Sequence, residues 1–114
     1  MKNQTFGIEI ETTGLGRERT ARALAALFGT TARHVGRHLD DWKVPMPDGR
    51  EWTVESDGSV TDPSAEVVSP VCRWEDIEMV QLVVRALRIQ LRLWRKHHVQ
   101  GQVCVHHGRS RNGD

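Results

Sequence analysis

The stretch Phe6-Gly-Ile-Glu-Ile-Glu11 decides how the chain begins to fold. Apolar and other residues alternate across residues 5–12, which is the period-2 pattern of a strand with one buried face. The pattern predicts that Phe6, Ile8 and Ile10 face a core, while Glu9 and Glu11 share the opposite face. A strand built only to cover a core does not need two carboxylates, so both glutamates are candidate functional residues.

The rest of the chain predicts two helices and several short strands. Residues 17–28 contain good helix formers and end at Gly29, a typical C-terminal stop. Strands are predicted at 32–35, 42–44, 51–55 and 65–69, with a turn at Pro-Asp-Gly49. A longer helix is predicted from Trp74 to about His97, with an apolar stripe made of Ile77, Val80, Val84, Leu87, Leu91 and Trp94.

The order of these elements predicts an α+β domain over residues 1–97, with a mostly antiparallel sheet and helices packed on one face. The apolar stripe of the long helix is expected to cover the sheet, and a partner helix is the alternative. Residues 98–114 are predicted to form a divergent polar tail.

Length and composition limit the class of protein. The chain has 114 residues, of which 38% are hydrophobic and 27% charged, as in an ordinary single globular domain. Its apolar runs are too short to cross a bilayer, and its first residues lack the apolar region of a secretory signal. We therefore expect a cytoplasmic protein without membrane contact. Cys72 and Cys104 are expected to be reduced thiols, although a bridge between them is an open alternative.

Charge is distributed unevenly. Every acidic residue except Asp114 precedes Met79, and the stretch from Arg85 to Arg111 is basic. Such a run is usually a solvated helix face, and binding of nucleic acid is the alternative. Base stacking would need exposed aromatic residues between the basic ones, and this interleaving is absent, so nucleic-acid binding is the weaker hypothesis.

The carboxylates suggest a cation site. Glu9 and Glu11 lie about 7 Å apart along one strand face, by twice the rise per residue. Glu66 lies within the apolar strand Ala65–Ser69, where an unpaired carboxylate is costly. Asp57 and Ser59 lie at a tight turn after the strand 51–55. Carboxylates converging on one sheet face would suit Mg²⁺ with a nucleoside triphosphate; a solvent face that happens to carry glutamates is the alternative.

Three motifs in order carry a resemblance to a known family. F-G-I-E-I-E, W-T-V-E-S-D-G-S-V and E-V-V-S-P resemble the amidoligases, carboxylate–amine ligases related to glutamine synthetase and glutamate–cysteine ligase. The resemblance covers about residues 5–87. It implies a fragment of a glutamine synthetase-like catalytic domain that uses ATP and Mg²⁺. The implied reaction joins a small-molecule or peptide carboxylate to an amine through an acyl phosphate.

The resemblance also implies residue roles. Glu9, Glu11 and Glu66 would be metal ligands, while Asp57 and Ser59 would face the substrate as catalytic residues. The family's C-G-x-H-V-H segment corresponds to Gly101–His106, in which His106 would bind the cofactor and Cys104 replaces a histidine.

A thiol is a poor Mg²⁺ ligand, so the chain is expected to be an incomplete copy of the ligase. The alternatives are a non-catalytic remnant or interaction module of the same fold, and a small basic nucleic-acid-binding domain. The sequence does not indicate the oligomeric state.

Two other patterns are weaker. Gly14-Leu-Gly16 lies between a strand and a helix, as in dinucleotide-binding folds, but Arg19 replaces the third glycine. The histidine pairs at 97–98 and 106–107, with Cys104, match no familiar structural zinc spacing.

Overall fold

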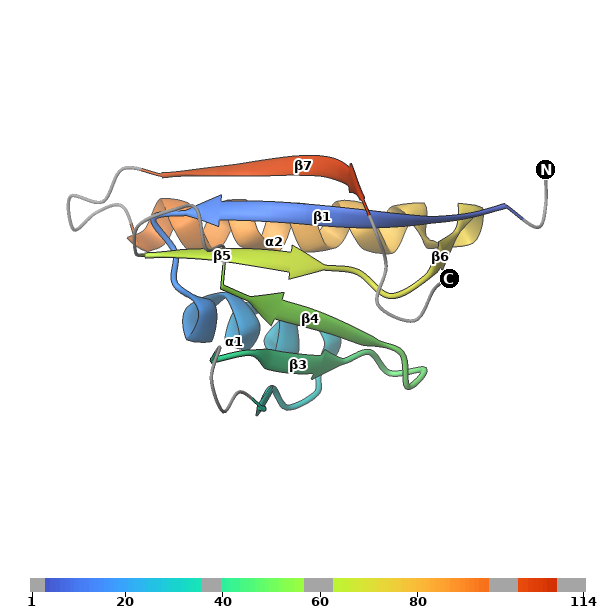
Figure 1. Cartoon of the computed structure of the whole chain (residues 1–114), viewed down its shortest axis with the longest axis horizontal. Helices are drawn as coiled ribbons and strands as arrows, with labels where there is room; N and C mark the ends of the chain where they lie inside the picture. The colour runs from blue at the N-terminus through green and yellow to red at the C-terminus, as the bar shows by residue number, and fades with distance from the viewer. Residues whose placement is uncertain (1–3, 36–39, 57–62, 95–100, 109–114) are drawn as a thin grey trace.

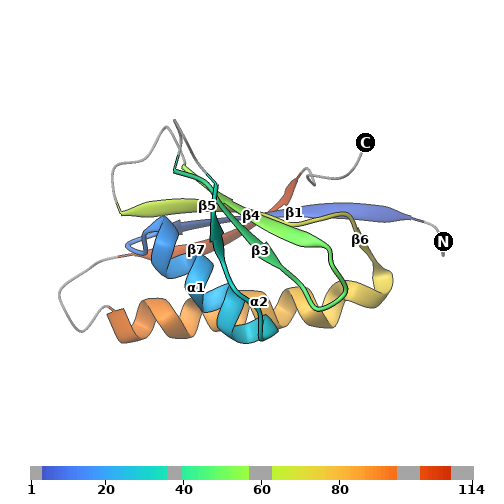
Figure 2. The same ribbon diagram turned by 90° about the horizontal axis from the view of Figure 1, so that it is seen from below.

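A computed structural model describes residues 4–35, 40–56, 63–94 and 101–108 of the chain. The fold is one twisted sheet with two α-helices on the same face, and the opposite face carries no helix from these residues (Figures 1 and 2). The elements are β1 (Thr5–Thr13), α1 (Arg17–Phe28), β2 (Arg33–His34), β3 (Trp42–Pro45), β4 (Glu51–Glu55), β5 (Ser64–Val68), β6 (Cys72–Arg73), a 3₁₀ turn η1 (Trp74–Asp76), α2 (Ile77–Trp94) and β7 (Gln102–Gly108).

The sheet is antiparallel throughout. Its order is β2-β3-β4-β5-β1-β6, and β7 also pairs with β1. The strand β1 is therefore central, with β5 along one edge and β6 and β7 along the other. This arrangement confirms the predicted α+β class with both helices on one face.

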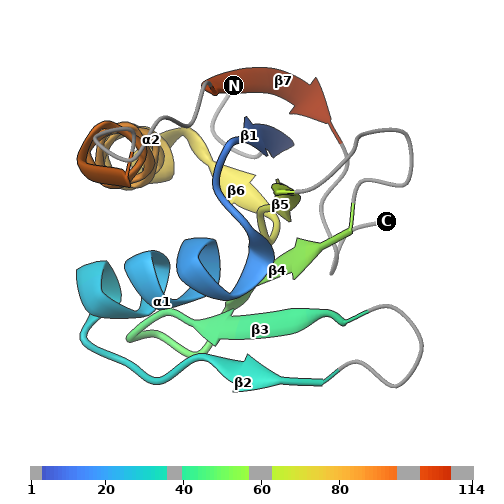
Figure 3. The same ribbon diagram turned by 90° about the vertical axis from the view of Figure 1, so that its left-hand side faces the viewer.

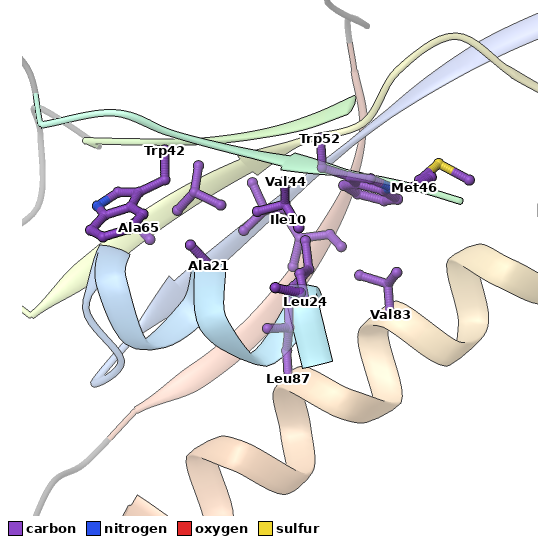
Figure 4. Packing of buried hydrophobic residues seen from close by; sticks show 13 residues of the cluster. Ile10, Ala21, Leu24, Trp42, Val44, Met46, Trp52, Ala65, Val83 and Leu87 are labelled. Atoms are coloured by element: carbon purple, nitrogen blue, oxygen red, sulfur yellow. The ribbon is translucent and has the colours of Figure 1, made fainter. Parts of the chain in front are cut away.

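The core lies between the sheet and the helices (Figure 4). Ile10 of β1 and Trp52 of β4 are fully buried on the sheet side, and Leu24 of α1 and Leu87 of α2 are fully buried on the helix side. The phase of the alternation in β1 is thus fixed, because burying Ile10 against the helices places the flanking glutamates on the other face.

Helix α1 has the predicted bounds, and Gly29 ends it. Gly29 has a left-handed φ of 71°, and its N–H is directed at the carbonyl groups of Ala25 and Ala26. A left-handed residue at this position closes the last turn of a helix, and glycine adopts it without a steric cost.

Helix α2 packs on the sheet, as the apolar stripe predicted. Val80, Leu87 and Leu91 are buried, and Val83 joins them although the stripe did not include it. Trp94, the last residue of the stripe, is only half-buried, and the guanidinium of Arg19 lies 3.8 Å from its ring centre. The predicted helix residues beyond Trp94 lie outside the described part of the chain.

Strand β7 lies within the residues predicted to be a polar tail. It pairs with β1 from Gly7↔Gly108 to Thr13↔Gln102, so this part of the tail belongs to the same sheet as the domain. Gly101 makes the approach possible, because a Cβ there would lie only 2.0 Å from the carbonyl oxygen of Thr13. Val103 and Val105 give residues 102–108 the two-residue alternation of a strand, but the polar composition of this stretch hid the pattern in the sequence.

An ion pair joins the β3–β4 hairpin to the start of the long helix. Both terminal nitrogens of Arg50 donate to the carboxylate of Asp76 at 2.9 Å, and one of them also donates to the carbonyl of Val71. This bidentate contact holds the pKa of Asp76 below its ordinary value of 3.8, chiefly through the hydrogen bonds from Arg50.

Neither α1 nor α2 combines the length and the apolar composition that a membrane-spanning helix needs.

Candidate functional site on the open face of the sheet

The open face of the sheet, opposite the helices, brings together the acidic residues that the sequence analysis selected. Glu9 and Glu11 lie on this face of β1, because Ile8 and Ile10, which alternate with them along the strand, turn toward the helices. Strand β5 presents Glu66 on the same face, since Ala65 and Val67 are fully buried on the other. Neighbouring strands lie about 4.7–4.9 Å apart, so these carboxylates are close neighbours.

The register arranges the site in two rows across the strands. In the first row, Glu11 pairs with Glu66 of β5, Glu66 pairs with Glu55 of β4, and Cys104 of β7 flanks Glu11 on the other side. Three carboxylates therefore occupy directly opposed positions on β1, β5 and β4.

The second row passes through Glu9. His106 of β7 is paired with Glu9, and on the other side the row continues through Val68 and Thr53 to Lys43. The ammonium of Lys43 donates to the hydroxyl of Thr53 at 3.0 Å, which fixes a cation on β3 in this row.

Sequence reasoning did not assign Glu55 a role. The face that Glu55 occupies could be predicted, because the alternation that buries Val54 places Glu55 on the open face. The pairing of Glu55 with Glu66 could not be predicted, because it depends on β4 and β5 being neighbours in the sheet.

His106 of β7 lies beside both glutamates of β1, and its predicted role in cofactor binding stays a prediction. Its Nε2 is 3.9 Å from Glu11 Oε1, a diagonal contact between the two rows. Cys104 and His106 are two residues apart in β7 and share one face, as an alternating motif requires. The predicted replacement of a histidine by Cys104 therefore falls directly beside Glu11.

Ser69 and Pro70 shape the strand exit. Ser69 is fully buried; its Oγ accepts a hydrogen bond from the N–H of Ile8 at 2.9 Å and donates to the carbonyl of Pro70 at 2.8 Å. The backbone N–H of Ser69 also donates to the carbonyl of Ile8. These bonds attach the end of β5 to β1 and so maintain the register between Glu11 and Glu66.

Asp57 and Ser59, the predicted catalytic residues, lie outside the described part of the chain. Their predicted role therefore stays a prediction.

The donor set on the open face fits a hard cation in its chemistry, because Glu9, Glu11 and Glu66 supply carboxylate oxygens from neighbouring strands. Within the described residues, however, no three Asp, Glu, His or Cys side chains are already arranged around one metal position. Ligation would require rotation of the glutamate side chains, which can occur without moving the strands.

Comparison with known proteins agrees with the motifs. No curated protein and no solved structure matches the chain. A family model does match residues 2–111, nearly the whole chain including β7, and its description is "Putative amidoligase enzyme". The chain that carries these carboxylates in register across β1, β5 and β4 therefore belongs to the amidoligase family.

Proposed function

We propose that the protein is an ATP- and Mg²⁺-dependent ligase that forms an amide bond between a carboxylate and an amine. The observation that supports this proposal is the opposed placement of Glu11 and Glu66, with Glu9 beside them, in a chain of the amidoligase family. Membership of the amidoligase family suggests the ligase chemistry. In this proposal, a nucleotide with its cation would bind on the open face of the sheet, beside the carboxylates.

In the proposed site, Glu9, Glu11 and Glu66 would hold Mg²⁺ through their carboxylate oxygens. Bound Mg²⁺ would offset the negative charge of the ATP phosphates near these glutamates. His106 borders Glu9 and Glu11, and in this proposal it would donate a hydrogen bond to a phosphate oxygen. The protein's contribution is position and electrostatics, since the sheet fixes the strands from which these side chains extend.

The proposed reaction has two steps. A substrate carboxylate oxygen attacks the γ-phosphorus of ATP, forming an acyl phosphate as the bond to ADP breaks. The amine nitrogen then attacks the acyl carbon, phosphate leaves with the bonding electrons, and the nitrogen loses a proton to a base. Asp57 and Ser59 are proposed to contact the carboxylate or the amine in these steps.

Cys104 favours a second candidate, a protein that binds the nucleotide without completing the ligation. The thiol is placed beside Glu11, where a harder donor would assist the cation. A remnant of this kind keeps the carboxylates and loses turnover.

Titration calorimetry tests the proposal directly. ATP with Mg²⁺ should bind to the wild-type protein, and Glu9→Gln with Glu11→Gln should weaken that binding at least tenfold. Glu18→Gln is the matched control, because Glu18 lies on α1 and pairs with Arg22 away from the open face. Equal ATP affinity in all three proteins would exclude this site.

A second measurement separates the ligase from the binding remnant. Hydroxylamine traps acyl phosphates as hydroxamates, so ATP, a mixture of free amino acids and hydroxylamine should give hydroxamate together with phosphate. Binding without hydroxamate or phosphate release for any carboxylate supplied would favour the remnant.

A further inference from the structure

A groove on the helix side of the sheet lies between α2 and β7, far from the carboxylates of the open face. The two elements run side by side at the edge of the molecule (Figure 3). The groove has a volume of about 610 Å³, and its lining residues are Val80, Gln81, Val84, Arg85, Arg88, Ile89, Arg92 and Val105.

The floor of the groove is apolar and uncovered. Val103 of β7 packs against the core, but Val105, two residues further on the same face, is 43% exposed. Ile89 of α2 is 46% exposed beside it. The helix layer therefore stops short of the last strand, and it leaves apolar surface of the sheet and of α2 in solvent.

The wall of the groove is basic. Arg85, Arg88 and Arg92 follow one another at helical spacing along α2, so their guanidinium groups are on one side of the helix. None of the three forms an ion pair with a carboxylate of residues 4–35, 40–56, 63–94 or 101–108. Arginines beside exposed apolar residues match a ligand that is acidic and apolar together.

We propose that this groove binds an acidic amphipathic helix from another protein. Such a helix would lie along α2 as a third member of the helix layer, at the usual interaxial distance of about 8–10 Å. Its apolar stripe would cover Val105, Ile89 and Val84, and its carboxylates would pair with the three arginines. The proposal is independent of the ligase activity, because the groove and the carboxylates lie on opposite faces of the sheet.

A second copy of the chain fits less well. Helix α1 is the other helix of the described residues, and Glu18 is its single acid among three arginines. The single acid of α2, Glu78, lies at its start, so two α2 helices would bring arginines together. The chain thus offers no acidic amphipathic helix within its described residues.

Nucleic acid also fits less well. Phosphates would satisfy the arginines but would leave Val84, Ile89 and Val105 without an apolar partner. Among the described residues that line the groove, none is aromatic and could stack on a base.

Fluorescence anisotropy with a labelled synthetic peptide tests the proposal. The probe is a three-heptad helix with leucines at the a and d positions and glutamates beside them. We expect saturable binding that falls at least tenfold with Arg85→Glu, Arg88→Glu and Arg92→Glu together, and with Ile89→Asp alone. The triple change of the same arginines to Gln, which avoids charge reversal, should weaken binding to a smaller extent.

The control variant combines Arg22→Glu, Arg33→Glu and Arg73→Glu, which changes the net charge equally away from the groove. It should bind the probe as the wild type does, and a probe with lysines for glutamates should not bind. Circular dichroism establishes that each variant is folded.

Three outcomes would overturn the proposal. The first is that the acidic peptide shows no saturable binding to the folded wild type, or that the control variant loses as much peptide affinity as the groove variants do. The second is a duplex oligonucleotide that binds through Arg85, Arg88 and Arg92 when the peptide does not. The third is that the wild type does not bind the peptide but forms a concentration-dependent dimer in sedimentation experiments, and that substituting the three groove arginines abolishes this dimer.

Discussion

The side chain of Glu9 on β1 lies over Gly108, its diagonal neighbour on β7. A Cβ placed on Gly108 would stand 2.5 Å from Cγ of Glu9 and 2.8 Å from its carboxyl carbon, which is closer than real contacts allow. The glycine therefore leaves the space that the Glu9 side chain occupies. Because the atoms in the way belong to the end of a flexible side chain, an added methyl group would displace the carboxylate and leave the strands in place.

The first prediction concerns this relationship. Gly108→Ala should leave the fold intact, since the side chain of Glu9 can rotate, but should weaken Mg²⁺-dependent ATP binding severalfold by moving one proposed ligand. Calorimetry gives the affinity, and circular dichroism gives the fold. The matched control is Gly16→Ala, for which the nearest atom to the new methyl is 3.8 Å away. Equal affinity in both variants would mean that Glu9 does not act as a ligand in this orientation.

The second prediction concerns Cys104, which is paired with Glu11. Cys104→His should increase the affinity for ATP with Mg²⁺ severalfold, because an imidazole beside Glu11 can donate to a phosphate oxygen better than a thiol. The control is Val105→His, which places the imidazole on the opposite face of the same strand. An increase with Val105→His as large as that with Cys104→His would assign the effect to added positive charge alone.

The third prediction concerns the ion pair of Arg50 with Asp76. The side chain of Asp76 is 16% exposed and accepts hydrogen bonds from both terminal nitrogens of the Arg50 guanidinium. Asp76→Asn should lower the free energy of unfolding at neutral pH by about 1.5–3 kcal/mol, the usual range for a hydrogen bond to a charged group. Urea denaturation measures this loss, and Asp48→Asn is the comparison. Asp48 also pairs with Arg50 but is 50% exposed, so its substitution should cost less.

The same ion pair sets a pH dependence. The pKa of Asp76 is lower in the folded protein than its ordinary 3.8, so the folded state favours the ionised form. The contribution to stability is complete above pH 3.8 and is lost as the pH falls through the folded-state pKa. The difference in unfolding free energy between wild type and Asp76→Asn should therefore shrink below pH 3.8. A constant difference down to pH 2 would contradict this linkage.

The fourth prediction concerns the end of α1. Gly29→Ala should destabilise the protein by about 1–2 kcal/mol, the cost of a left-handed conformation for a residue with a Cβ. Apart from the chain neighbours of Gly29, no atom of the described residues lies within 4 Å of the added methyl, so the cost is conformational and not steric. Gly29→Asn should cost less, since asparagine tolerates this conformation better. Thermal unfolding of both variants checks the order, and equal melting temperatures for them would argue against the backbone as the cause.

Much of the local structure followed from the sequence. Helix formers and Gly29 determined α1, and the alternation in β1 determined that Glu9 and Glu11 share a face. These features depend on neighbours in the chain, through the 3.6-residue and two-residue periods of side-chain direction. The three motifs F-G-I-E-I-E, W-T-V-E-S-D-G-S-V and E-V-V-S-P likewise carried the resemblance to the amidoligases, to which the chain belongs.

Strand β7 and the neighbours of each carboxylate were decided only by tertiary structure. Residues 102–108 have a polar composition, and only pairing with β1 makes them a strand and brings His106 and Cys104 beside Glu9 and Glu11. Glu55 became part of the site because β4 pairs with β5. The sequence by itself determined which face of a strand each residue occupies, because that direction is local. Which strands lie together depends on hydrogen bonds between distant segments and on burial of Ile10 and its core partners, which no local pattern contains.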